Sequence, residues 1–256
     1  MNHWLIAPIL IPLVGGFLQV FMGYAPLRLR RTLGLITTGL LLASTVILLM
    51  MATDGSYRVY AFGNWAPPFG IVMVLDRLAA LMLFMTALLG LFSHLYSMGR
   101  TDVDSRQFHA LFLFQLMGLN IAFLTGDLFN LFVAFEVLLI ASYGLLLHGD
   151  GKQRTIPGLH YVVLNLIGSA MFLIAVGMIY SVTGTLNMAD LAVTIPTLSA
   201  DKLPLVEAGG MILLVVFALK AALIPLTFWL PKAYATASAP VAALFAVMTK
   251  VGVYAI

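Results

Sequence analysis

The sequence predicts an all-α, polytopic transmembrane helix bundle, and three observations lead to this fold class. Hydrophobic residues make up 62% of the 256 residues, charged residues make up only 9%, and the mean hydropathy is +1.07. Such a chain has too little polar surface to cover a soluble globule. About eight apolar stretches are long enough to span a bilayer as helices. They cover residues 4–23, 32–52, 70–98, 108–125, 128–147, 158–183, 205–230 and 238–256.

The segments between these spans are short and rich in turn-forming residues. The loop 63–70 contains Trp65, which we expect at the membrane interface. Asp127 directly precedes an apolar run, so it is expected to cap the N-terminus of the fifth helix. The link 183–204 is the longest, and it is predicted to include a short amphipathic turn.

Basic residues predict how the bundle is oriented. One set of loops holds most of the Lys and Arg residues, whereas the opposite set holds only Arg58 and Lys202. Because basic residues concentrate in cytoplasmic loops, the richer side is expected to be cytoplasmic and the N-terminus outside. The residues of the richer side are Arg28, Arg30, Arg31, Arg100, Arg106, Lys152, Arg154 and Lys232.

A lysine and a proline interrupt the seventh span. Lys220 lies about 13 residues after Glu207 and about 10 before Leu230, which places it near the middle of the bilayer. An ionisable residue at this depth indicates a functional site. Pro225 lacks a backbone N–H, so we expect the seventh helix to break about one turn after the lysine, with Pro225 as a hinge. Broken membrane helices occur at the binding or transfer sites of transporters.

Two further ionisable residues are predicted at a similar depth. Glu136 lies about nine residues into the fifth span, and Lys250 about ten residues after Pro240 in the eighth. A carboxylate facing lipid is costly, so Glu136 is expected to face the bundle interior. Together with Lys220, these residues predict a row of titratable groups suited to proton relay. Two structural interpretations stay open, namely an ion pair that locks two helices for Glu136 and a side chain that reaches toward the membrane surface for Lys250.

The remaining polar residues add two candidates for the site, and the motifs that the sequence lacks exclude several classes of function. His160 and Asn165 on the sixth span are secondary candidates, with two interpretations: a hydrogen-bonded internal histidine or a role in a water relay. The sequence contains no Cys, which excludes disulfides, thiolate metal sites and cysteine-ligated clusters. It also lacks nucleotide-binding and hydrolase motifs. We therefore expect no cofactor, no metal, no nucleic-acid partner and no hydrolytic or redox site in this chain.

Four motifs can be compared with known families. They are Gly126-Asp-Leu-Phe-Asn-Leu-Phe-Val-Ala-Phe-Glu136, Thr183-Gly-Thr-Leu, Leu219-Lys220 followed by Pro225 and Trp229-Leu-Pro231, and Thr249-Lys250-Val-Gly-Val-Tyr-Ala. Taken together, they resemble the antiporter-like subunits of respiratory complex I, and most of all the D subunits of the multisubunit Mrp (Pha) cation/proton antiporters. The resemblance covers the whole chain. It implies two inverted five-helix repeats, each with a broken helix, and a proton relay through Glu136, Lys220 and Lys250.

The chain differs from the family pattern at one position, and the resemblance implies where its two domains meet. Many relatives carry a histidine five residues after the Trp of the Trp-Leu-Pro motif, where this chain has Tyr234. Residues 1–107 would form three N-terminal helices, and residues 108–256 the first five-helix repeat, truncated at its C-terminal end. We therefore expect the sequence to be the N-terminal part of a longer protein.

Three functional hypotheses follow. The first is a subunit of a secondary antiporter that exchanges protons for Na⁺ or K⁺, assembled with other antiporter subunits in the bacterial inner (plasma) membrane. The second is a proton-pumping subunit of a redox-driven complex, such as complex I or a membrane-bound hydrogenase. The third is a non-transporting helical scaffold whose buried charges are merely paired. The relay residues cannot separate the first two, because both would use them.

Overall fold

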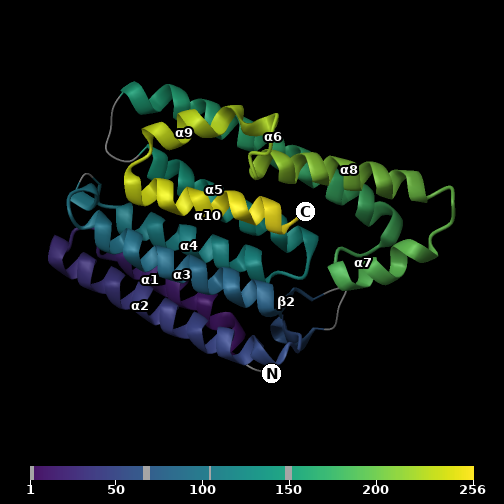
Figure 1. Ribbon diagram of the computed structural model, residues 1–256, viewed down its shortest axis with the longest axis horizontal. Coiled ribbons are helices and arrows are strands. Elements are labelled where there is room, and N and C mark those ends of the chain that lie inside the picture. The colour runs from purple at the N-terminus through teal and green to yellow at the C-terminus, as the bar shows by residue number, and fades with distance from the viewer. Residues whose placement is uncertain (1–2, 66–69, 104, 148–151) are drawn as a thin grey trace.

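The chain folds into a bundle of long, nearly parallel or antiparallel helices (Figure 1). The structure is a computed structural model that describes residues 3–65, 70–103, 105–147 and 152–256. The side chains of Lys152 and Arg154 lie outside the described part. The described helices are α1 (Ala7–Phe21), α2 (Leu27–Met51), α3 (Arg77–Ser97), α4 (Phe108–Leu124), α5 (Leu128–Leu146), α6 (Lys152–Thr183), α7 (Met188–Thr194), α8 (Leu203–Lys220), α9 (Leu230–Thr236) and α10 (Ala239–Tyr254).

The prediction of about eight spans in an all-α bundle is confirmed. Six segments of the described chain are long and apolar enough to cross a membrane, and they contain α1, α2, α3, α5, α6 and α8. The apolar helices α4 and α10 are slightly shorter. The two remaining helices are too short to span. α7 lies in the long link after α6, where a short amphipathic turn is expected, and α9 follows the break in the seventh span.

The predicted start of the third span is wrong. Residues Val72–Leu75 form strand β2, which pairs antiparallel with β1 (Arg58–Ala61). Helix α3 begins only at Arg77. Asp76 caps its N-terminus, because the Asp76 side chain accepts a hydrogen bond of 2.6 Å from the Ala79 N–H. Hydropathy cannot separate a buried apolar strand from the helix that follows it, which explains the error. Most of the loop expected at the interface, residues 66–69, lies outside the described residues.

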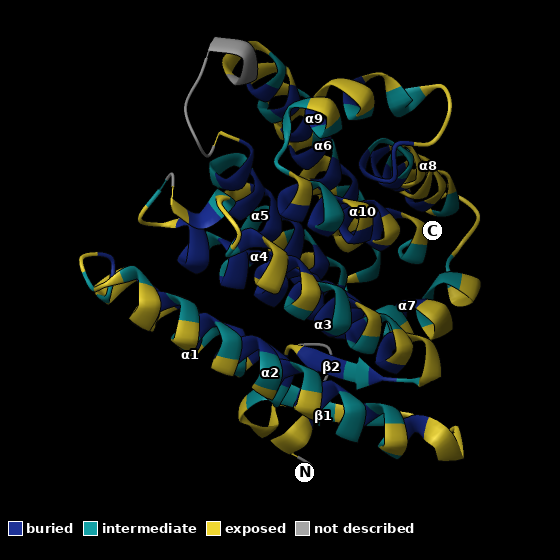
Figure 2. Ribbon diagram, turned by 60° about the vertical axis from the view of Figure 1, so that its left-hand side comes forward, coloured by how far each residue is buried: buried dark blue, intermediate teal, exposed yellow. Residues whose placement is uncertain are grey.

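Helix α4 forms the centre of the bundle. Nearly all of its side chains are buried, and it packs against α1, α3, α5 and α10 (Figure 2). Even its polar residues His109, Gln115 and Asn120 are buried, as expected of a helix that is enclosed on all sides. Gly118 allows α5 to approach closely, because a Cβ at this position would lie 2.8 Å from the backbone nitrogen of Leu138. By contrast, α1 and α2 expose large apolar side chains on their outer faces, as expected of surfaces that meet lipid.

Backbone hydrogen bonds tie three connections together at the hairpin end of the bundle. The Gly126 N–H donates to the Val72 carbonyl at 3.0 Å, and the Leu128 N–H donates to the Leu186 carbonyl at 2.9 Å. Asp127 lies between them and caps α5 by accepting from the Asn130 N–H at 2.9 Å, which confirms its predicted role. Burial raises the pKa of the Asp127 carboxyl, although hydrogen bonds from the backbone N–H groups of Asn130 and Phe129 partly oppose the shift.

At the opposite end of the bundle, a half-buried arginine pairs with a buried carboxylate. Arg31 of α2 donates two hydrogen bonds, of 2.6 and 2.7 Å, to the carboxylate of Asp102 in the turn between α3 and α4. Burial by itself would raise the pKa of Asp102, but the hydrogen bonds and charge of Arg31 outweigh it and lower the pKa. At the same end, Arg30 donates to the backbone carbonyl of Arg106 at 3.0 Å. Three of the predicted cytoplasmic residues therefore meet at one end of the bundle.

Candidate functional site

The seventh span is broken, and the break begins at Lys220. This residue is the last of α8, and regular α-helix resumes only at Leu230 after the 3₁₀ turn η6 (Leu226–Trp229). The break therefore starts before Pro225 and not one turn after the lysine. Ala222 adopts a left-handed conformation with φ of 55°, which turns the chain out of the helix. At the end of the helix, the Leu219 carbonyl accepts hydrogen bonds from the Ala222 N–H at 3.1 Å and from the Trp229 indole N–H at 3.0 Å, so a side chain from beyond the break is tied to the end of α8.

Lys220 points into the protein. Its side chain is only 4% exposed, and its Nζ lies 4.7 Å from the centre of the Phe135 ring on α5. Within the described part of the chain, this ammonium has no hydrogen-bond partner. The space beside it is lined by Phe135, Asn165, Trp229 and Met248 and has no room for a water molecule. The ring face therefore supplies the cation–π contact that partly replaces the water lost from the ammonium.

Glu136 lies one residue beyond Phe135 and is half-buried. Its Oε1 accepts a hydrogen bond from the hydroxyl of Ser169 on α6. Among the described residues no ion pair joins Glu136 to Lys220, so their charged atoms are more than 4.0 Å apart. Carboxylate and ammonium therefore lie on neighbouring helices of the same region without direct contact.

Lys250 lies apart from these two residues. It is on an exposed face of α10, where its Nζ is 3.4 Å from the hydroxyl of the adjacent Thr249. The three ionisable residues thus have different environments in this chain. Lys220 is enclosed, Glu136 is half-buried and Lys250 faces outward.

The two secondary candidates, Asn165 and His160, lie in different environments. Asn165 is buried, lines the space beside Lys220, and donates from Nδ2 to the Tyr161 carbonyl at 2.8 Å. His160 is exposed and is not internal; it lines a groove on the outer face of α6 together with Lys232.

Sequence reasoning missed several polar residues around the site. The Tyr161 hydroxyl lies 2.9 Å from the Ser142 hydroxyl and 3.4 Å from the Met248 sulfur, which also accepts from Gln115 Nε2 at 3.8 Å. These contacts link α4, α5, α6 and α10 beside Lys220. One signal was available, because Ser169 and Asn165 are four residues apart and so share a face of the sixth helix.

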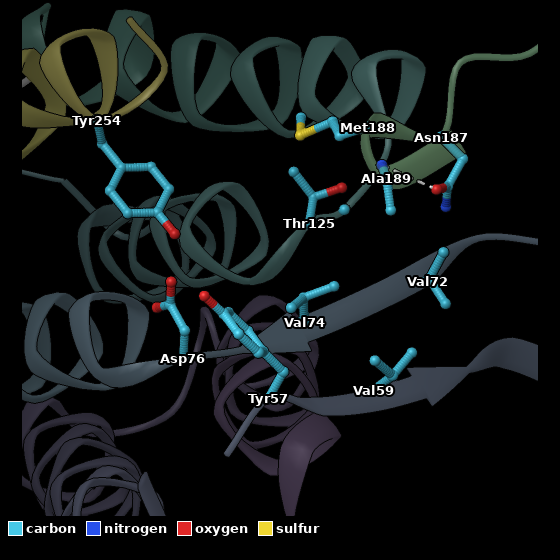
Figure 3. A pocket seen from close by; sticks show the side chains of 11 residues that line it. Tyr57, Val59, Val72, Val74, Asp76, Thr125, Asn187, Met188, Ala189 and Tyr254 are labelled. Atoms are coloured by element: carbon cyan, nitrogen blue, oxygen red, sulfur yellow. Dashed lines mark hydrogen bonds between the residues drawn. The ribbon is translucent and has the colours of Figure 1, made fainter. Parts of the chain in front are cut away.

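A separate pocket lies at the hairpin end of the bundle, between β1, β2, α7 and the end of α10 (Figure 3). Its volume is about 470 Å³. The Asp76 carboxylate and the hydroxyls of Tyr57 and Tyr254 gather at one end, while valine side chains cover the other. The Tyr254 hydroxyl is engaged, because it donates to the Phe123 carbonyl at 3.1 Å. The pocket contains none of the predicted relay residues.

Residues 125–256 match a family model described as NADH:quinone oxidoreductase/Mrp antiporter, TM. This region is just over half of the chain, and it contains Glu136, Lys220 and Lys250. The chain belongs to this family. The predicted resemblance to Mrp antiporter subunits and the antiporter-like subunits of complex I is therefore confirmed.

Individual relatives agree with the family. The chain is 50% identical to the D subunit of a probable K⁺/H⁺ antiporter of Rhizobium meliloti (strain 1021), over 100% of this chain and 48% of that protein. A chain of the Mrp complex from Dietzia sp. DQ12-45-1b matches with a TM-score of 0.88 and 34% identity, covering 100% of this chain and 48% of that one. The membrane-bound sulfane sulfur reductase, an archaeal respiratory membrane complex, contains a chain with a TM-score of 0.92 and 31% identity, and the match covers 99% of this chain and 52% of that one.

The chain thus spans about half the length of these family members. Family membership together with the apolar helices makes it a multi-pass membrane protein of a bacterial antiporter family.

Proposed function

We propose that this chain is part of a membrane subunit that exchanges protons for Na⁺ or K⁺ within a hetero-oligomeric antiporter complex in the bacterial plasma membrane. The observation that carries the proposal is Lys220, an enclosed ammonium without a hydrogen bond to any described residue, at the end of a broken helix. The relative named as part of a K⁺/H⁺ antiporter supports the same activity. Residues 1–107 would be three N-terminal helices and residues 108–256 the first of two inverted repeats.

The geometry suits proton transfer linked to a small movement. An ammonium without a polar partner is costly inside a protein, so Lys220 is driven either to release its proton or to move toward a carboxylate. Glu136 is the acidic residue next to the Phe135 ring that now covers Lys220, and its carboxylate accepts a hydrogen bond from the Ser169 hydroxyl. Because Lys220 adjoins non-helical backbone, the break can absorb such a movement without distorting α8.

Lys250 would be the next group in the relay. Its exposed position on α10 leaves the ammonium open to a group outside this chain. Asn165 lines the Lys220 site and would orient the ammonium, while Pro225 would help to keep the chain non-helical at the hinge.

The test is an exchange assay on the complete complex in sealed vesicles. We expect an imposed Na⁺ or K⁺ gradient to drive proton movement without any electron donor, as reported by a pH-sensitive dye. The likeness to an archaeal respiratory complex supports a second candidate, a proton-translocating subunit of a redox-driven complex. In that case protons would move only when donor and acceptor are supplied. If protons move under neither condition, the non-transporting scaffold is the hypothesis that remains.

We further propose that the N-terminus faces outside and that Arg31 and Asp102 lie at the cytoplasmic end, because basic residues gather there. In this cysteine-free chain, a cysteine replacing Ser56 should react with a membrane-impermeant thiol reagent on intact cells. A cysteine replacing Ser105 should react only after the cells are permeabilised. The reverse pattern on intact cells would invert the proposed orientation.

A further inference from the structure

A groove runs along the outer face of the bundle between α6 and the broken segment. It has a volume of about 400 Å³. Leu159 and Val163 line it from α6, and Phe228 lines it from η6. Leu159 is 61% exposed and Phe228 is 56% exposed, so the apolar walls are open to the surroundings of the protein. In a membrane-spanning chain such a surface meets acyl chains.

Two basic side chains, His160 and Lys232, line the same groove. Both are exposed, and among the described residues neither has a hydrogen bond or ion pair with another side chain. His160 lies eight residues into α6, about 12 Å along the helix from its start, and therefore near the membrane surface. A lysine in a groove that opens toward lipid needs an anion or water for its charge.

We propose that this groove binds one anionic phospholipid. Its phosphate contacts Lys232 and His160, and one acyl chain lies along Leu159, Val163 and Phe228. Apolar walls combined with two basic side chains complement an acyl chain attached to an anionic headgroup, whereas a zwitterionic lipid offers the same acyl chain without the net charge.

The bound lipid would connect the segment after the break with α6. Lys232 belongs to α9, after the break, while His160 belongs to α6. The inner wall of the groove includes Trp229, whose indole also lines the space beside Lys220. Occupancy would therefore hold the segment after the break against α6. The binding itself does not depend on the exchange activity.

The test is lipid binding by the full-length protein in its purified complex. Native mass spectrometry would count the dioleoyl phosphatidylglycerol molecules retained, with dioleoyl phosphatidylcholine as the comparison lipid. We expect one tightly held phosphatidylglycerol. In a variant carrying Lys232→Gln and His160→Gln, its affinity should fall by at least about fivefold, the loss expected for one removed basic contact. Lys202→Gln removes an exposed lysine from the α7–α8 link and should leave binding unchanged.

A second variant tests the walls of the groove. Val163→Trp should fill it and displace the lipid while both basic groups remain. Equal retention of phosphatidylglycerol by the wild type and the charge variant would overturn the proposal. So would equal affinity for the two lipids, which would mark the groove as a general acyl-chain surface. Finding no retained lipid in the wild type would show that another subunit or water occupies the groove.

Discussion

Replacing Lys220 by alanine is expected to reduce cation-driven proton exchange by the complete complex to below about 1% of the wild-type rate, the scale of loss for a removed proton-transfer group. Lys220→Arg should fail as well, because a guanidinium keeps its proton under all relevant conditions. This second variant separates a residue that must gain and release a proton from one that supplies only a fixed positive charge. Glu136→Gln should be similarly inactive, whereas Glu136→Asp should retain part of the activity with a shifted pH optimum.

Two matched controls are available on α8 and just before it. Lys202→Ala and Glu207→Gln repeat the same chemical changes at exposed positions near the start of that helix, and both should exchange like the wild type. Vesicle assays with a pH-sensitive dye give the rates, and native gels confirm that each complex assembles. Exchange at the wild-type rate in Lys220→Arg would show that the site needs only a positive charge. The same result in Glu136→Gln would reduce the glutamate to a packing role.

The second large effect is expected at Gly252 on α10. A Cβ at this position would lie 2.6 Å from the backbone nitrogen of Ala221 and 2.9 Å from its Cα, immediately after Lys220. Backbone atoms cannot rotate away as a side-chain end can, so Gly252→Ala must push α10 and the break apart. Overpacking of this kind costs about 1–3 kcal/mol. Replacing a helical glycine by alanine gains only about 1 kcal/mol in helix propensity, so the cost dominates when the backbone cannot yield. We expect a lower thermal stability of the complex and at least about a tenfold loss of exchange, since the displaced backbone carries Lys220 with it.

Gly210→Ala is the control for this substitution. It makes the same change on α8, where a Cβ would meet no atom within 4 Å, and it should keep or slightly raise the thermal stability. Thermal denaturation of the purified complexes and the vesicle assay measure the two effects. If Gly252→Ala unfolds and exchanges like the wild type, then α10 does not hold the break in position.

Hydropathy was sufficient to predict most of the fold. A bilayer requires about 20 apolar residues for each crossing helix, so composition predicts the number and approximate limits of the spans. Local chemistry also predicted the Asp127 cap, which depends only on neighbouring residues, and a break near Pro225. The hairpin of β1 and β2 was missed, because four apolar residues before α3 resemble an extension of that helix. The ion pair of Arg31 and Asp102 was missed too, since it joins residues 71 positions apart.

The candidate site was only partly predictable. A charged residue deep in an apolar span is visible in any sequence, and this is how Glu136, Lys220 and Lys250 were selected. The residues that contact these three side chains could not be predicted. Lipid and protein interior are both apolar, so a membrane helix shows little periodicity that would indicate which face points inward. Only the packing of α5, α6, α8 and α10 shows that Lys220 meets the Phe135 ring, that Ser169 is hydrogen-bonded to Glu136, and that Lys250 faces outward. Each of these positions depends on how far a helix is rotated about its own axis.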